Sequence, residues 1–304
     1  MSPRRVLLFH RDFRELRGGH LKVWHYFQHA AASRCFAPQI YFTPESRGIP
    51  DNPWQGITPP PLETWQPRDA DLLFLAGVDW EAVPDPAPAP VINLIQGVRH
   101  GNAGDPRRSY LSRPAVRICV SEEVATAILA TGEVNGPLHV IPNGVDLENI
   151  PCVEQRNIDV VIAGAKNPTL ARELHERLVH EGLTCRLLTG TILRSDFLDL
   201  LSRAAVAVTL PKREEGFFLP ALEAMAAGAL VVCPDCVGNR GFCHDRVNCF
   251  MPPYELEAIA QATLRAARLE PGHRAALGLA AKTESQRHSL DAERSAFLQI
   301  LDTL

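Results

Sequence analysis

The segment with the clearest pattern reads Lys212-Arg-Glu-Glu-Gly-Phe-Phe-Leu-Pro-Ala-Leu-Glu-Ala-Met-Ala-Ala-Gly228 and continues as Ala229-Leu-Val-Val-Cys233. Pro220 suits the first turn of a helix, because proline fixes φ and has no amide hydrogen to donate, and Gly228 suits a helix end. The apolar run that follows predicts a strand buried on both faces. A loop, a helix over 220–227 and a buried strand in succession indicate a parallel α/β sheet.

The same alternation of strands and helices extends along the chain. Asp71-Leu-Leu-Phe-Leu-Ala76 and Asp159-Val-Val-Ile-Ala163 are continuous apolar runs, which are typical of parallel strands covered by helices. Asn167 and Pro168 have the pattern of a helix start, and Gly182 is expected to end that helix. Strands are predicted at 5–9, 38–42, 71–76, 91–95, 116–120, 138–141, 158–163, 184–188, 205–210, 229–233 and 248–251.

The chain is predicted to form two domains. Its 304 residues equal about two ordinary domains, and Pro142-Asn-Gly144 and Pro151 interrupt a polar stretch between two strands. We predict Rossmann-like, doubly wound domains over 1–150 and 151–285, facing each other across a cleft. Ligands of such sheets bind beyond the carboxyl ends of the strands. A helix over 286–304 either packs back on the first domain or serves a dimer, with one apolar face made of Leu290, Phe297, Ile300, Leu301 and Leu304.

Composition excludes several classes of protein. The net charge is −4, so no basic surface is expected to hold a nucleic acid. No apolar stretch approaches the roughly 18 residues of a membrane span, and the N-terminus lacks the pattern of a signal peptide. The 8 cysteines are therefore expected to be reduced, and the protein to be cytoplasmic. Peripheral attachment at the inner membrane face and a homodimer both stay open.

Two carboxylates flank the predicted start of the 220–227 helix. Glu215 lies in the loop and Glu223 one turn into the helix. A helix start offers unpaired amides and the positive end of the dipole, which together accept phosphate. Glu223 is then placed to accept two ribose hydroxyls, and Glu215 to reach a sugar. The alternative is an acidic loop beside helix charges that the dipole favours.

Three further positions carry chemistry at strand ends. Lys166 lies between the 158–163 strand and the helix opened by Pro168, where a cation and a helix start suit a phosphate. Arg17-Gly-Gly-His20 follows the first strand, and paired glycines permit close approach to a ligand. His100 lies just beyond the 91–95 strand. A solvated lysine, a plain turn and a structural histidine are the alternatives.

The segment from Glu215 to Glu223 resembles the Glu-x7-Glu signature of family-4 retaining glycosyltransferases with the GT-B fold. The Glu-Gly-Phe opening, the Leu-Pro-x-Leu-Glu-Ala-Met-Ala-x-Gly continuation and the following strand all match. Other segments that resemble the family are Val140-Ile-Pro-Asn-Gly-Val-Asp146, Val237-Gly-Asn-Arg-Gly241 and Arg246-Val-Asn-Cys-Phe250. The resemblance covers about 140–260 well and the first half only loosely.

The resemblance implies a role for each matching residue. It places an acceptor-side domain at 1–150 and a nucleotide-sugar donor domain at 151–285. The catalytic residues are expected to be Glu215, Lys166 and His100. The donor is expected to contact Glu223, Gly216, Phe217, Phe218, Leu219, Gly164, Arg172, Gly18 and Gly19, with backbone amides near Phe217 and Phe218 meeting the diphosphate. The acceptor is expected to meet His20 and Lys22.

The implied activity is transfer of a sugar with retention of configuration. The donor is a nucleotide diphospho-sugar, and the acceptor is a hydroxyl of a glycan, a lipid-linked glycan or a small molecule, as in polysaccharide biosynthesis. Attack is expected on the same face as the leaving group, with the donor phosphate taking the acceptor proton. No cofactor and no metal are expected.

Other interpretations remain at this stage. The family commonly has glycine where this chain has Phe218, which suggests an inactive nucleotide-sugar-binding partner as one alternative. A nucleotide-sugar epimerase, or a phosphorylase that needs pyridoxal phosphate, is another. Asp69-Ala-Asp71 mimics a metal motif but precedes its strand, and the loose group of Cys233, Cys236, Cys243, His244 and Cys249 suggests zinc only weakly.

Overall fold

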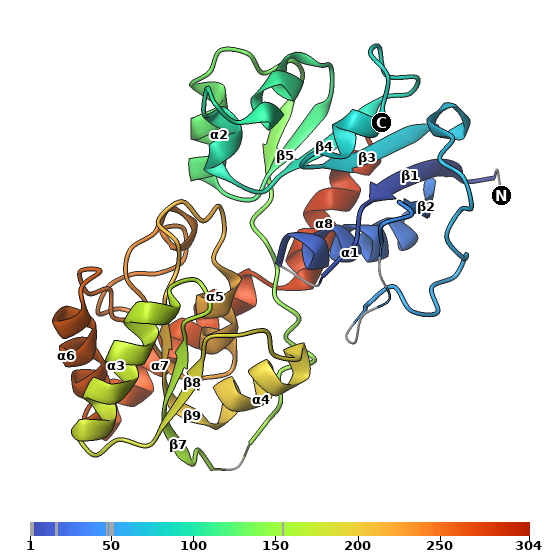
Figure 1. Ribbon diagram of the computed structural model, residues 1–304. Helices are drawn as coiled ribbons and strands as arrows, with labels where there is room; N and C mark the ends of the chain where they lie inside the picture. Colours follow the sequence, from blue (N-terminus) through green and yellow to red (C-terminus); the bar gives the residue numbers. More distant parts are fainter. Residues whose placement is uncertain (1–2, 16–17, 47, 49–51, 154) are drawn as a thin grey trace. The chain divides into compact units, whose positions relative to one another are not determined.

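The computed structural model describes residues 3–15, 18–46, 48, 52–153 and 155–304. Its contacts divide the chain into two compact units (Figure 1). The first unit comprises residues 1–143 together with 291–304, and the second comprises 144–290. The predicted α/β class with parallel sheets is confirmed in both units. Among the described residues, none of the helices combines the length and the apolar character needed to cross a membrane.

The first unit is built on a parallel sheet. Its described residues form six strands in the order β2-β1-β3-β4-β5-β6. The strands are β1 (Arg5–Arg11), β2 (Phe36–Phe42), β3 (Leu72–Ala76), β4 (Val91–Ile95), β5 (Val116–Cys119) and β6 (Leu138–Val140). The helices are α1 (Gly18–Ala31), α2 (Glu122–Leu129) and α8 (Leu290–Leu301). Strands β3 and β4 are buried at every residue, as their unbroken apolar sequences predict.

The C-terminal helix α8 packs within the first unit. Figure 1 shows α8, in red, beside α1, in blue. The ring of Phe297 meets Tyr26 edge-on, with centroids 4.9 Å apart, and lies 6.0 Å from Phe74. Lys22 of α1 forms an ion pair with Glu293 of α8, and both side chains are 0% exposed. A charge buried to this degree needs a partner, so the pair fixes α8 on α1.

The second unit has a smaller parallel sheet. Its described residues form four strands in the order β10-β9-β7-β8. The strands are β7 (Ile158–Ala163), β8 (Cys185–Leu188), β9 (Ala204–Thr209) and β10 (Leu230–Val232). The helices are α3 (Pro168–His180), α4 (Arg194–Arg203), α5 (Leu219–Ala226), α6 (Leu256–Ala267) and α7 (Pro271–Arg287). Asn167 caps α3 by accepting the Leu170 amide at 3.4 Å.

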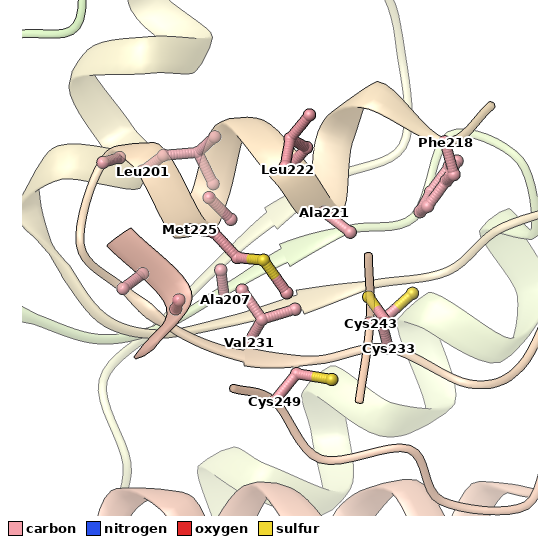
Figure 2. Close-up of a cluster of buried hydrophobic side chains, with 14 of the residues drawn as sticks. Leu201, Ala207, Phe218, Ala221, Leu222, Met225, Val231, Cys233, Cys243 and Cys249 are labelled. Atoms are coloured by element: carbon pink, nitrogen blue, oxygen red, sulfur yellow. The ribbon is translucent and has the colours of Figure 1, made fainter. Parts of the chain in front are cut away.

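Helices cover both faces of this sheet. Residues of α3 and α6 pack on one face, and residues of α4, α5 and α7 pack on the other. Figure 2 shows Leu222 and Met225 of α5 above Ala207 and Val231 of the sheet. Cys233, Cys243 and Cys249 are buried at the border of this cluster. The buried face of α5 therefore fixes how its first turn lies at the carboxyl end of the strands.

Two local predictions were wrong. Residues 248–251 do not form a strand. Phe250 instead makes an isolated bridge to Val232, because the turn with a bond from the Arg246 amide to the Cys249 carbonyl leaves too little extended chain. Leu304 is 39% exposed, and α8 ends at Leu301, so the apolar face of this helix ends one turn earlier than predicted.

Gly164 makes the closest approach between α3 and its strand. A Cβ built on Gly164 would lie 2.1 Å from Cβ of Ala171. Neither group belongs to a long side chain that can move aside, so the loop after β7 requires a glycine there.

Gly164→Ala is expected to destabilise the protein by about 1–3 kcal/mol through overpacking. Ala171→Gly in the same chain should recover much of that loss, since it removes the clashing atom. Urea unfolding measures both effects. Gly190→Ala is the matched control, because a Cβ there meets no atom within 4 Å. Equal losses for Gly164→Ala and Gly190→Ala would refute the packing argument.

Glu293→Ala is expected to cost about 3–5 kcal/mol, since it removes the carboxylate that balances the fully buried charge of Lys22. Replacing both residues, as Lys22→Met with Glu293→Leu, should be far less damaging. Asp291→Ala on the same helix removes an exposed ion pair with Arg294 and should cost less than about 1 kcal/mol. Unfolding of the three variants in urea tests the ranking, which a damaging double variant would contradict.

Candidate functional site

The strand order of the second unit defines a switch point. The chain passes from β7 to its neighbour β8 and then crosses back to β9 on the other side of β7. The loops that follow β7 and β9 therefore leave the sheet in opposite directions. Open α/β sheets bind ligands at such a point, beyond the carboxyl ends of the strands.

Lys166 and Glu215 meet at this switch point. Lys166 follows β7 and Glu215 follows β9, and Nζ lies 3.3 Å from Oε1. The contact is an ion pair without hydrogen-bond geometry, because the same oxygen has no hydrogen-bond partner. The lysine side chain is 48% exposed and the glutamate 20%. Lys166 is thus partly open to water, whereas the Glu215 oxygen that it contacts is buried.

Glu223 is paired with a residue that the sequence did not predict. Its carboxylate is 4% exposed, and Oε1 lies 2.7 Å from Nη2 of Arg194. Arg194 opens α4 in the segment after β8. In the sequence, only the position of Arg194 after a strand could have suggested that it lies at the site. A strand separates Arg194 from both glutamates along the chain, so the spacing does not show that Arg194 meets Glu223.

The loop before α5 is braced from behind. The Phe218 amide donates to the Gly238 carbonyl at 2.9 Å. A Cβ on Gly238 would lie 2.7 Å from the backbone carbonyl oxygen of Glu215 and 2.7 Å from the backbone nitrogen of Phe217. Asn239, next in the chain, donates to Cys233 Sγ at 3.2 Å and to the Pro234 carbonyl at 3.0 Å. The segment that follows β10 thus holds the backbone of 215–218.

The structure corrects the expected role of Phe218. Its amide already serves the Gly238 carbonyl, so it is not the donor expected for a diphosphate. Leu219 is the first residue of α5 and Pro220 has no amide hydrogen, so Leu219 carries the first amide of the helix end. The Phe218 ring is 2% exposed and belongs to the core cluster of α5 (Figure 2). The ring therefore does not narrow the space beside Gly216 and Phe217.

The other donor-side positions differ in character. Gly164 stands where α3 packs on β7, as described above, which is a structural reason for glycine. Its carbonyl accepts the Asn167 amide at 3.0 Å, at the turn that carries Lys166. Arg172 lies on the exposed side of α3, within the second turn.

The first unit has its own switch point, between β1 and β3. Asp79 is buried beyond β3 and accepts from Arg11 Nη1 at 2.6 Å and from the Ala76 amide at 2.9 Å. Arg11 Nε donates to His20 Nδ1 at 3.3 Å. His20 thus lies beside a buried ion pair, which the sequence did not predict, although Arg11 and Asp79 each stand at or just past a strand end.

The paired glycines begin α1 at the same edge. Gly18 is the first residue of the helix, and the Gly19 carbonyl accepts from Gln96 Nε2 at 3.2 Å. Arg17, which precedes them, lies outside the described residues.

The structure contradicts an acceptor role for Lys22. Its ammonium group is occupied by Glu293 and lies 2.9 Å from His25 Nδ1. Because Lys22 is on the face of α1 that packs on α8, it serves the core of the first unit. Lys22 lies four residues after Gly18, the first residue of α1, and only the partner helix shows that it is buried.

His100 is held neutral. It lies in a short 3-10 helix, η3 (Val98–Gly101), beyond β4 and is 5% exposed. Burial lowers the pKa of His100 to about 3, and the nearby Arg107 guanidinium adds to this shift. The imidazole is therefore neutral near pH 7 and can exchange hydrogen bonds, but it cannot act as a cation.

The two other motifs show no ligand-binding arrangement. Asp71 Oδ2 accepts the Val6 amide at 2.6 Å at the amino ends of β1 and β3, the edge opposite the ligand edge. Burial raises the pKa of the Cys236 thiol well above its usual value, which disfavours the thiolate that zinc requires. No metal-binding group of three or more His, Cys, Asp or Glu residues is found among the described residues.

Residues 136–268 match the family model described as "Glycosyl transferases group 1". D-inositol 3-phosphate glycosyltransferase from Xylanimonas cellulosilytica is 33% identical over 156 residues, which cover 51% of this chain and 36% of that protein. The match therefore spans about a third of that relative's length. Lys166, Arg194, Glu215 and Glu223 all lie inside the segment that the family model matches.

Solved structures share the fold over nearly the whole chain. HepE from Anabaena, in a complex with UDP-glucose, has a TM-score of 0.73 at 16% identity, covering 99% of this chain and 100% of that one. Sucrose-phosphate synthase from Thermosynechococcus elongatus has a TM-score of 0.75 at 16% identity and covers 99% of each chain. The chain thus has the α/β architecture of the GT-B glycosyltransferases, with two parallel-sheet domains.

His100→Gln is expected to flatten the pH dependence of stability. With a folded-state pKa of about 3 and an unfolded value near 6.5, the unfolded chain takes the proton first as the pH falls below 6.5. His100 should therefore reduce the free energy of unfolding by up to about 2 kcal/mol between pH 7 and pH 5. Urea unfolding at both pH values tests this, with the exposed His273→Gln as control. A wild-type slope in His100→Gln would refute it.

Proposed function

We propose that the protein is a retaining, metal-independent glycosyltransferase that uses a nucleotide diphospho-sugar as donor. The acceptor is a hydroxyl of a glycan, a lipid-linked glycan or a small molecule. The observation that carries the proposal is the meeting of Lys166 and Glu215 at the switch point, within the segment that matches the glycosyltransferase model.

The proposed chemistry needs stabilisation of a leaving diphosphate. When the bond from the anomeric carbon to the phosphate oxygen breaks, negative charge grows on that oxygen. Lys166 and the amino end of α5 supply positive charge there, and such fixed electrostatic terms are the largest in many enzymes. The acceptor oxygen forms the new bond on the same face, and its proton passes to the donor phosphate. Glu215 is assigned to the donor sugar and Glu223 to the ribose.

Comparison with known proteins suggests which donor to test first. HepE has been solved with UDP-glucose and with UDP and glucose. The identity to HepE is only 16%, so UDP-sugars are a starting point rather than an assignment. GDP-, ADP- and dTDP-sugars belong in the same screen, in which a ligand of the native state raises the unfolding temperature.

The position of Phe218 weakens the alternative of an inactive binding partner. The alternative of an inactive partner requires the Phe218 ring to fill the donor space, but the ring packs with α5 in the core. A nucleotide-sugar epimerase can be told apart by its products. It would convert one nucleotide-sugar into another, and adding an acceptor would not cause release of a nucleoside diphosphate.

Lys166→Ala is expected to lower kcat by about 100-fold or more with little change in donor affinity, since the lysine acts on charge that develops during bond cleavage. Glu223→Ala is expected to weaken donor binding by about tenfold or more, because it removes hydrogen bonds to a charged group. Calorimetric titration and initial rates of nucleoside diphosphate release separate the two effects, and NMR of the product shows the anomeric configuration.

The exposed Lys282→Ala on α7 is the matched charge control and should behave as wild type. Wild-type rates and affinities in both Lys166→Ala and Glu223→Ala would remove the site assignment. An inverted product would remove the retaining mechanism, and loss of turnover on chelation of divalent ions would contradict metal independence.

A further inference from the structure

Arg194 and Glu223 form a partly buried ion pair next to the proposed donor site. The Glu223 carboxylate is 4% exposed, the Arg194 side chain is 27% exposed, and their closest atoms are 2.7 Å apart. Glu223 lies on α5 among core residues, where an unpaired carboxylate would be strongly disfavoured. Arg194 therefore offsets part of the cost of burying the Glu223 carboxylate.

The place of Arg194 on its own helix is unfavourable. It is the first residue of α4, and no side chain caps that end. The amino end of a helix carries partial positive charge, so a cation there is destabilised. Such a departure from local preference is expected where a residue serves a site rather than its own element. The ion pair with Glu223 offsets this unfavourable position of Arg194.

The pair also fixes the carboxylate in space. The contact of Arg194 Nη2 with Glu223 Oε1 restrains that oxygen, and the planar guanidinium donates along fixed directions, unlike the compact ammonium of lysine. A carboxylate has about four lone-pair sites, so one bond to Arg194 leaves acceptor capacity for ligand hydroxyls. Two ribose hydroxyls need a carboxylate in one orientation, and rotation of Glu223 would lose one of the two bonds.

We infer that Arg194 is a positioning residue that orients Glu223 toward the ribose hydroxyls, so that the site selects ribonucleotides over 2′-deoxyribonucleotides. The inference rests on the proposed function, since it concerns the same donor. In this proposal Arg194 affects recognition of the ribose by orienting Glu223, and Arg194 itself does not contact the phosphates.

The test compares a nucleoside diphosphate with its 2′-deoxy counterpart, beginning with UDP and 2′-deoxy-UDP, by calorimetric titration. Wild type is expected to bind the ribose form about tenfold more tightly or better, because the deoxy ligand leaves a buried acceptor unpaired. Arg194→Ala should weaken binding of the ribose form by about tenfold and leave the deoxy form within about twofold. Arg194→Lys, which keeps the charge without the planar fork, should fall between the two.

A second comparison shows whether Arg194 acts through Glu223. In the Glu223→Gln background, Arg194→Ala should cause no further loss of affinity, whereas independent contacts would give additive losses. Arg203→Ala at the other end of α4 removes an exposed arginine paired with Asp199 and is the matched control for folding and charge. Thermal unfolding of each variant shows whether it remains native.

Several results would overturn the inference. Equal losses for both ligands in Arg194→Ala would indicate a phosphate contact or general damage, and tighter binding would mean that Arg194 competes with the ribose. Wild type that binds both ligands equally would refute the selection while leaving the proposed function intact. If wild type bound none of the UDP, GDP, ADP and dTDP ligands, both the proposed function and this inference would fail.

Discussion

The central position of β7 is the constraint on which the second unit depends. Because β7 is bonded to β8 on one side and β9 on the other, the chain must reverse its direction of winding between them. The reversal separates the two loops that follow β7 and β9 and leaves room for a ligand at the carboxyl edge. Lys166, Arg194 and Glu215 reach that edge from three strands that are far apart in sequence. The first unit repeats the arrangement with Arg11, His20 and Asp79 around β1 and β3.

Three ion pairs described above differ in burial and in what they do. Lys22 and Glu293 are fully buried and join two helices of one core, so their partnership is structural. Arg194 and Glu223 are less deeply buried and stand at the ligand edge. Lys166 and Glu215 have the most exposed side chains of the three pairs, and the lysine is open to a ligand at this edge. Burial therefore separates the ion pairs that hold the fold from the ones that are available to a ligand.

The sequence predicted the fold well because its strands are continuous apolar runs and its helices have clear ends. It also predicted that Lys166 and Glu215 each follow the carboxyl end of a strand, but it did not show that the two strands are neighbours. It did not predict Arg194, since nothing in one sequence shows which side chain faces Glu223 from another helix. Lys22 was misassigned for the same reason, as its partner is 271 residues away. The sequence did not show where the Phe218 ring points, because that direction depends on how α5 packs. It did not show that the Phe218 amide is occupied either, because its acceptor is the Gly238 carbonyl, 20 residues further along the chain.

The bracing of the 215–218 backbone by Gly238 joins the candidate ligand loop to the core. Gly238 is held through its neighbour Asn239, whose side-chain Nδ2 donates to Sγ of Cys233, the residue that follows β10. A loop that is tied to the end of β10, a buried edge strand of the sheet, cannot open without disturbing that strand, so its opening is coupled to the core. Engineering a new donor preference by lengthening or replacing this loop would therefore trade against folding, whereas changes at its exposed neighbours Arg213 and Glu214 would be tolerated more easily.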